Sequence, residues 1–475
     1  MILMSVILGM CLNAMLGYWL TRCFFNDAFK QVEPVSRLIL IYLIGQFLGS
    51  MTYWLWLLLG VHVYGTWILL DLIVIGTLAY GASQHKNSQK NTLTQAVSLS
   101  QQQLVTWLVF AGIGWVMVWC LGWHIARLPY GGWDAAAMWN YRVSYIALPR
   151  EQWLDIFKTP AAHPDYPLMH SLTAARLCAL TGHWQPVVTA WLGVAHALVV
   201  LVLLLGTVMQ RVGIRIAILG AMLLVASNLW WEYSSWQYAD ITLCCYMFAS
   251  AVMFCHWFDR NDPDHHGLLY AALLLLGTCA WTKNEGWPWV IGMGVVILAC
   301  LWFKPIPGKT KWLMRCTLCL LAVLWMPLTV HWMSEQGNGM VRGMVSEDVS
   351  RRLFDPQRMI MIASYYWQFL RLFYPWLITV MLLAVCLLSR YRPNSSRSRV
   401  GWLVILLFVG QLSVYLLVFM TTEHDLKWHL HTAAKRLFNQ IWPLWILGCC
   451  LLAADEKTVW ARERSSHALQ SQPQH

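Results

Sequence analysis

One carboxylate stands out in the first of two short polar motifs of this 475-residue chain. Asp134 lies in the segment GGWDAAAMWNYR (131–142), and the segment HPDYPLMH (163–170) follows it. Trp133 and Tyr141 flank Asp134 within the first motif. A positioned carboxylate can take the proton of a bound hydroxyl group. The sequence therefore predicts Asp134 as the leading candidate for acid–base chemistry.

The elements that must position Asp134 are membrane helices. The chain is 59% hydrophobic and 12% charged, and its mean hydropathy is +0.52, whereas soluble domains carry roughly 25% charged residues. Runs of about 20 apolar residues, long enough to cross a hydrocarbon core, recur along the chain. The runs are continuous rather than alternating, which indicates helices and not a barrel. The predicted fold class is an all-α polytopic integral membrane protein.

We expect about thirteen membrane-spanning helices. They are predicted at 2–21, 38–59, 66–82, 104–121, 186–209, 216–230, 240–258, 267–281, 288–303, 316–333, 367–389, 400–420 and 437–454. The first run lacks a basic leader and a cleavage site, which favours a retained helix. Three parts follow: an N-terminal group of helices (1–103), a main transmembrane unit (104–454), and a disordered cytoplasmic tail (455–475).

Lysine and arginine residues predict the orientation of the helices. Short basic connections stay in the cytoplasm, which places the C-terminus inside and the N-terminus outside. The outward connections are then 122–185, 231–239, 282–287, 334–366 and 421–436. The net charge of +11 reflects this topology and contact with anionic membrane lipids. The basic residues are dispersed, so no nucleic-acid footprint is expected.

The outward connections carry most of the candidate functional residues. The 122–185 connection is predicted to lie on the membrane as short amphipathic helices, one of them at 135–148 with Trp139, Val143 and Ile146 on one face. The other connections hold WWEYSSWQYADI (230–241), TKNEGWPW (282–289), an arginine-rich loop and TTEHDLKWHLHTAAKRL (421–437). Aromatic rings can stack on sugars, and Lys and Arg can hold phosphate. These residues are the expected parts of a site for a lipid that carries a sugar phosphate.

The chain also resembles a known family. The Asp134 loop, HPDYP (163–167), YAD (238–240), KNEG (283–286) and KRLFNQIWP (435–443) are similar to motifs of polytopic GT-C glycosyltransferases, in the bacterial branch related to protein mannosyltransferases and aminoarabinose transferases. The resemblance covers roughly 104–450. It implies transfer of a sugar, with inversion, from a polyprenyl-phosphate donor to a lipid, glycan or protein acceptor on the outer face of a bacterial inner membrane.

The resemblance also implies roles for individual residues. Asp134 is the expected essential carboxylate, acting as general base or orienting the acceptor. The expected donor-phosphate ligands are Lys283 and Arg436 first, with Arg342, Arg351 or Arg352 as further candidates. The expected substrate-binding residues are Trp133, Tyr141, His163, Asp165, Tyr166, Tyr238, Asp240 and Glu285.

Two features depart from the family pattern. In the family the catalytic Asp commonly follows the first helix, whereas three extra helices precede that unit here. Ala135, Ala136 and Ala137 stand where a second carboxylate would follow. The missing carboxylate argues against a metal site built on two acidic residues. The histidines match no strong ligand spacing, and no cofactor is predicted, although a divalent metal ion stays open.

Other roles remain open for several of these residues. Asp134 could cap the helix that follows it, and Glu232, Asp240 and Glu285 could pair with cations for structure alone. Asp71, within the third predicted helix, must face protein or water, where a structural hydrogen bond is favoured over a proton relay. For the whole chain, the alternatives are a lipid-linked glycan ligase or polymerase, a flippase or transporter, and a structural assembly factor.

Overall fold

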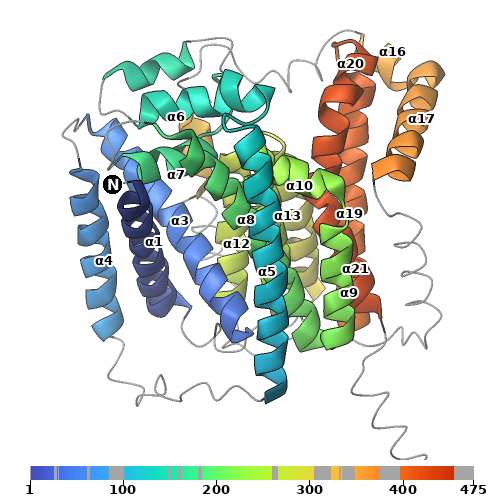
Figure 1. Ribbon diagram of the computed structural model, residues 1–475. Coiled ribbons are helices and arrows are strands. Elements are labelled where there is room, and N and C mark those ends of the chain that lie inside the picture. The colour runs from blue at the N-terminus through green and yellow to red at the C-terminus, as the bar shows by residue number, and fades with distance from the viewer. Residues whose placement is uncertain are drawn as a thin grey trace, which may run out of the picture.

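The fold is a bundle of helices with a layer of short helices across one end (Figure 1). The computed structural model describes residues 2–25, 29, 32–60, 65–84, 101–147, 151–158, 163–179, 184–258, 266–303, 323–330, 333, 348–373 and 396–453. Within these ranges every regular element is helical, and no strand is present. The chain is an all-α polytopic membrane protein, as its apolar runs predict.

Long apolar helices form the bundle. They are α1 (Ile2–Phe24), α3 (Pro34–Leu58), α4 (Trp67–Gln84), α5 (Gln101–Arg127), α8 (Pro186–Arg211), α9 (Ile214–Val225), α11 (Ala239–Phe258), α12 (His266–Thr282), α13 (Gly286–Phe303), α19 (Ser396–Thr421) and α21 (Lys435–Leu452). Of the helices in the described ranges, six are long and apolar enough to cross a membrane, or seven if a bent pair counts as one span. The predicted total of thirteen stays a prediction, because 316–322, 331–332 and 374–389 lie outside the described residues.

The bent pair corrects the predicted span at 216–230. Two helices occupy this region, α9 and α10 (Asn228–Ser235), and they meet at 66°. The break falls at Ser227, whose extended backbone leaves the helix. The indole of Trp231 donates to the carbonyl of Val225, 2.7 Å away, and satisfies one helix-end acceptor. The axis of the polar helix α10 therefore departs from the axis of the apolar helix α9.

Short helices cover the upper end of the bundle in Figure 1. They include a π-helix η2 (Ala135–Trp139), α6 (Asn140–Ile146), a 3-10 helix η3 (Glu151–Phe157) and α7 (Met169–Cys178). The predicted helical face of Trp139, Val143 and Ile146 is fully buried, but it packs on protein, because α6 contacts α7 and η3. This cap therefore extends the protein core and does not rest on the membrane through that face.

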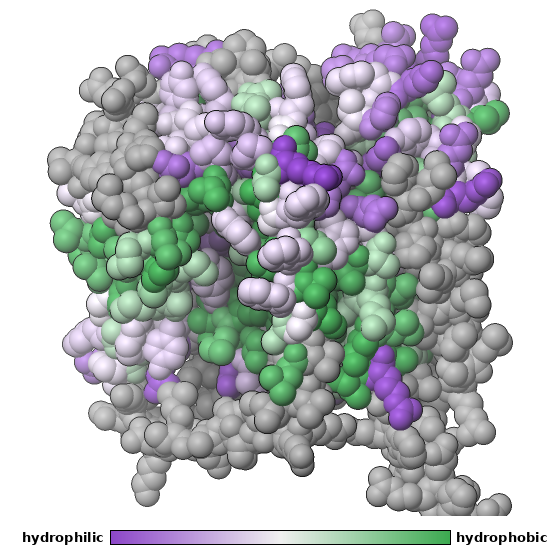
Figure 2. Space-filling view, viewed as in Figure 1, coloured by the Kyte–Doolittle hydropathy of each residue, from purple (hydrophilic) through white to green (hydrophobic). Residues whose placement is uncertain are grey.

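Further helices stand beside α19 at the same end. They are α16 (Val349–Leu353), α17 (Pro356–Phe373), α20 (Leu426–His429) and the π-helix η6 (Leu430–Ala434). The second half of the predicted 334–366 loop is therefore helical. Figure 2 shows hydrophobic side chains over the middle of the bundle and hydrophilic side chains gathered toward the capped end. That distribution fits a helix bundle whose capped end faces water.

Candidate functional site

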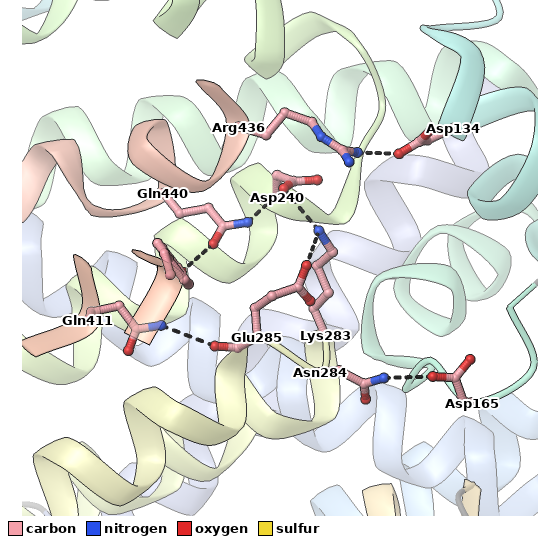
Figure 3. Close-up of polar contacts among 10 residues, drawn as sticks. Asp134, Asp165, Asp240, Lys283, Asn284, Glu285, Gln411, Arg436 and Gln440 are labelled. Atoms are coloured by element: carbon pink, nitrogen blue, oxygen red, sulfur yellow. Dashed lines mark hydrogen bonds and ion pairs between the residues drawn. The ribbon is translucent and has the colours of Figure 1, made fainter. Parts of the chain in front are cut away.

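The predicted site residues from distant parts of the chain meet at the capped end. Arg436, in the first turn of α21, forms an ion pair with Asp134, 302 residues earlier in the chain (Figure 3). The Asp134 side chain is 22% exposed and that of Arg436 is 16% exposed. Partial exposure leaves both groups able to meet a bound molecule.

Two glycines bring Asp134 to this place. Gly131 has φ +75°, a backbone conformation that favours glycine. A Cβ on Gly132 would lie 2.4 Å from the hydroxyl oxygen of Tyr238, so any larger residue would displace the Tyr238 side chain. The amide of Gly132 donates to the carbonyl of Trp236, 3.2 Å away. The Asp134 segment is therefore docked directly on the connection between α10 and α11.

Two amide side chains hold the same junction. Asn140 Nδ2 donates to Gln237 Oε1 at 2.8 Å, and Gln237 Nε2 donates to the carbonyl of Pro129 at 2.9 Å. Both side chains are buried, and Gln237 has φ +61°. A strained backbone of this kind persists where its surroundings over-determine it. Asn140 and Gln237 thus fix the position of the segment that carries Asp134.

Asp134 does not cap the helix that follows it. It occupies the N-cap position of η2, yet its side chain makes no capping hydrogen bond and pairs with Arg436 instead. The backbone N–H of Asp134 donates to the Tyr238 hydroxyl, 3.3 Å away. The helix-capping role that the sequence left open for Asp134 is therefore wrong. Its carboxylate faces the guanidinium of Arg436.

Tyr238 lies against both members of this ion pair. The guanidinium of Arg436 lies over the Tyr238 ring, 5.4 Å from its centroid. Burial and the charge of Asp134 raise the pKa of Tyr238 to about 12. The phenol therefore stays protonated at neutral pH and can donate a hydrogen bond to a ligand.

A second, buried cluster lies beside the first. Lys283 Nζ is 3.1 Å from Asp240 Oδ1 and 2.8 Å from Glu285 Oε1. Lys283 and Asp240 are each 3% exposed, and Glu285 is 15% exposed. Burial disfavours the ammonium ion, but the two carboxylates outweigh that effect and raise the pKa of Lys283 above its ordinary value. Lys283 is therefore a charged residue held between two anions.

Neutral side chains complete the cluster. Gln440 Nε2 donates to Asp240 Oδ1 at 2.6 Å, and the hydroxyl of Tyr415 donates to Gln440 Oε1 at 2.6 Å. Gln411 Nε2 donates to the carbonyl of Glu285 at 3.3 Å. Helix α21 thereby holds the carboxylate of Asp240, and helix α19 holds the backbone of Glu285 (Figure 3). Asp240 and Glu285 have the structural ion pair that the sequence left open, and their predicted contact with substrate stays a prediction.

The HPDYP segment lies against the KNEG segment. Asn284 Nδ2 donates to Asp165 Oδ2 at 2.9 Å, and Lys283 Nζ lies 5.9 Å from the centroid of the Tyr166 ring. The ring of His163 contacts that of Tyr166, 5.5 Å between centroids. Three predicted substrate residues are therefore brought to the Lys283 side of the site.

Other predicted residues have different surroundings. Trp133 is 80% exposed, and Tyr141 packs on Tyr145 with ring centroids 4.7 Å apart. Arg351 is exposed on α16, which packs on α19. Arg352 is engaged by the carbonyl of Thr421 and by Glu423. Arg342 lies outside the described residues, so its predicted role stays a prediction.

Comparisons with known proteins return one similar solved structure for this chain. Helices of the chain superpose on ArnT from Cupriavidus metallidurans, solved bound to undecaprenyl phosphate, with 14% sequence identity and a TM-score of 0.46. The alignment covers 78% of this chain and 64% of ArnT, so the chain spans less than two thirds of that protein. No protein-family model and no curated protein sequence matches the chain.

No metal cluster is found in the described ranges. There, no three His, Cys, Asp or Glu side chains lie close enough together to hold a metal ion. The Asp240–Lys283–Glu285 cluster places a lysine between its two carboxylates. Lys, Arg and amide groups pair with one carboxylate oxygen of each acidic side chain, whereas Asp240 Oδ2 and Glu285 Oε2 are buried without a hydrogen-bond partner among the described residues.

The sequence did not single out the residues that support the site. Gln440 and Asn284 stand within the KRLFNQIWP and KNEG segments, beside residues that were chosen for their charge. Arg142 follows Tyr141 in the first motif, but nothing in its spacing shows that it is fully buried. Its Nη2 donates to the carbonyl of Tyr166 at 2.7 Å. Adjacency to a predicted site residue is the signal that could have found Asn284 and Arg142, and a spacing of one helical turn from Arg436 could have found Gln440.

We expect Arg142→Met to destabilise the capped end. Arg142 donates to the carbonyls of Tyr166 and Pro167, which methionine would leave without these donors. A lost hydrogen bond of this kind costs about 1–3 kcal/mol. The melting temperature of the purified protein in detergent should fall. Lys158→Gln, at an exposed residue of the same connection, is the control, and an equal melting temperature for Arg142→Met would contradict the role.

His170 predicts loss of stability in mild acid. Burial lowers the pKa of this imidazole to about 4, and its Nδ1 lies 2.8 Å from Thr242 Oγ1. The unfolded chain binds a proton near pH 6.5 while the folded chain does not, so stability is full above 6.5 and falls toward pH 4. The expected loss between pH 7 and pH 5 is roughly 2 kcal/mol. Melting temperatures against pH should fall more steeply for wild type than for His170→Asn, and parallel curves would contradict this.

Proposed function

We propose that this protein is a membrane glycosyltransferase that moves one sugar from a polyprenyl-phosphate donor to an acceptor hydroxyl. The observation that carries the proposal is the Asp134–Arg436 ion pair. It places a partly exposed carboxylate beside an arginine at the capped end of an apolar helix bundle. Aromatic rings and the buried Lys283 cluster lie next to it. The motif resemblance to GT-C glycosyltransferases supports the same reading.

Arg436 is the better placed of the two leading phosphate ligands. The Lys283 side chain is almost fully buried, and Asp240 and Glu285 already balance its positive charge. Arg436 is more exposed, and its guanidinium can hold a phosphate with two parallel hydrogen bonds. A donor phosphate bound to Arg436 would draw it away from Asp134. The same step would free the carboxylate to act as a base.

The proposed reaction is a single displacement with inversion. The acceptor oxygen bonds to the anomeric carbon while the bond from that carbon to the phosphate oxygen breaks. Asp134 takes the proton of the acceptor hydroxyl, and the bonding electrons leave with the polyprenyl phosphate. Arg436 stabilises the charge that develops there. One base suffices for inversion, because no covalent sugar intermediate forms.

The proposed setting is the inner membrane of a bacterium, with the capped end toward the periplasm and the C-terminus in the cytoplasm. The basic connections support it through the positive-inside rule. The acceptor is a lipid, glycan or protein at the outer face. A cysteine placed at Trp133, which is 80% exposed, should react with an impermeant maleimide added outside whole spheroplasts. Reaction only after the cytoplasm is opened would reverse the orientation.

Mass analysis of surface glycolipids and glycoproteins, with and without the protein, tests the proposed function. We expect a single sugar residue to disappear from one acceptor when the protein is absent. Loss of a whole polymer would instead identify a glycan ligase or polymerase. Precursor that accumulates at the inner face would identify a flippase or transporter.

A further inference from the structure

Helix α7 is buried along its whole length. All ten of its residues are buried, although it belongs to the connection between two membrane helices. It begins two residues after the HPDYP segment ends, so its position sets the position of Asp165 and Tyr166. These two residues contact Asn284 and Lys283. The contacts that hold α7 in place therefore also position the residues around Lys283.

Each of the three N-terminal helices makes a polar contact with α7. From α1, Ser5 Oγ donates to the carbonyl of Leu177 at 2.8 Å. From α3, Ser50 Oγ lies 2.9 Å from Thr173 Oγ1. From α4, Asp71 forms an ion pair with Arg176. Three independent helices therefore converge on one short helix of the cap.

The Asp71–Arg176 pair is the strongest of these contacts. The two side chains are 1% and 2% exposed. Arg176 also donates to Asn13 Oδ1, and Thr52 Oγ1 donates to Asp71. The guanidinium lies 4.8 Å from the centroid of the Trp67 ring. Charges are costly inside a membrane protein and usually mark function, and this pair has no part in the proposed chemistry.

The backbone around the pair is also adapted to it. A Cβ on Gly49 of α3 would lie 2.8 Å from the guanidinium carbon of Arg176. Glycine at this position lets α3 pass directly over the arginine. The ion pair thus occupies a closed site to which all three N-terminal helices contribute a residue: Asn13, Gly49 and Asp71.

We infer that Asp71 and Arg176 are positioning residues, through which the three N-terminal helices hold α7 and thereby the Tyr166–Lys283 side of the donor site. The expected change in donor kinetics rests on the proposed function. The N-terminal helices then have a role within the catalytic unit. The pair is closed off from solvent and acts through α7.

A native cysteine reports on this arrangement without any assay of transfer. Cys178 is the last residue of α7 and is fully buried. Burial raises the pKa of its thiol to about 12, so a maleimide should leave it unmodified in the wild-type protein. Loosening of α7 should expose it. Modification by an impermeant maleimide, located by peptide mass spectrometry, measures that loosening directly.

The test compares Asp71→Asn, Arg176→Gln and the double variant in the full-length protein. Each single change leaves one buried charge without its counter-ion, whereas the two amides of the double variant can bond to each other. We expect the maleimide to modify Cys178 in both single variants. We also expect kcat/KM to fall about 100-fold, as small misplacements at a site can cost. The loss should appear as a raised donor KM with an unchanged acceptor KM. The double variant should regain both properties in part.

Cys23→Ala is the matched control, because the Cys23 thiol donates to the carbonyl of Leu78 and so joins α1 to α4 rather than to α7. If the single variants do not accumulate in membranes, Ser50→Ala and the double variant are compared with wild type in their place, by the same two measurements. A protected Cys178 in the variants, or an exposed one with wild-type donor KM, would overturn the inference. Were wild type inactive in transfer, the proposed function would fail while the Cys178 result still tested the hold on α7.

Discussion

Replacing Asp134 with asparagine is expected to lower the transfer rate by about 10²–10⁴-fold, the usual contribution of a general base. Asparagine keeps the shape of the side chain and can still accept a hydrogen bond from Arg436, but it cannot take a proton. Helix η2 should form as before, because the Asp134 side chain does not cap it. Initial rates with a polyprenyl-phosphate sugar in proteoliposomes measure the effect, and the melting temperature checks the fold.

Asp155→Asn provides the control for that experiment. Asp155 lies on η3 in the same connection, and its side chain is 47% exposed and 3.5 Å from Lys158. We expect this variant to keep wild-type activity, since its carboxylate stands at the surface. Full activity of Asp134→Asn, or an equal loss in Asp155→Asn, would remove Asp134 from the proposed chemistry.

The second large effect is expected at Lys283. Lys283→Met would leave Asp240 buried without its cation, and breaking a buried ion pair in this way costs about 3–5 kcal/mol. Donor use should fall as well, because Asp240 and Glu285 would repel an incoming phosphate. Melting temperature and donor KM are the two measurements.

A double variant separates the structural part of that effect from the functional part. Lys283→Met with Asp240→Asn removes both charges of the pair, a change that is often nearly neutral for stability. We expect the melting temperature to recover most of its loss while donor use stays low. Recovery of both properties would show that Lys283 serves the fold alone. Recovery of neither would contradict the pairing described for Asp240.

The helices of the bundle could be predicted from the sequence because their apolar runs are long. The spans of α1, α3, α4, α8, α11 and α19 follow directly from hydropathy. The break between α9 and α10 could not be predicted in this way. Hydropathy averages over a window and does not register Ser227, where the backbone leaves the helix.

The charged residues of the candidate site could also be predicted, but their partners could not. Charge, outward position and motif order singled out Asp134, Asp240, Lys283, Glu285 and Arg436, which the fold brings together. The ion pair between Asp71 and Arg176 could not be predicted, because it joins two residues that are 105 positions apart in the chain. Long-range pairing of this kind depends on how the helices pack, and a single sequence carries no signal for it.

The most direct measurement follows the donor lipid in proteoliposomes that contain the purified protein, a polyprenyl-phosphate sugar and an extract of envelope acceptors. Mass spectrometry of the lipid fraction distinguishes the possible fates of the donor. We expect free polyprenyl phosphate, formed in step with an acceptor that is heavier by one sugar, and neither product with Asp134→Asn. Donor that stays intact, whether in place or moved to the opposite leaflet, would contradict sugar transfer by this protein.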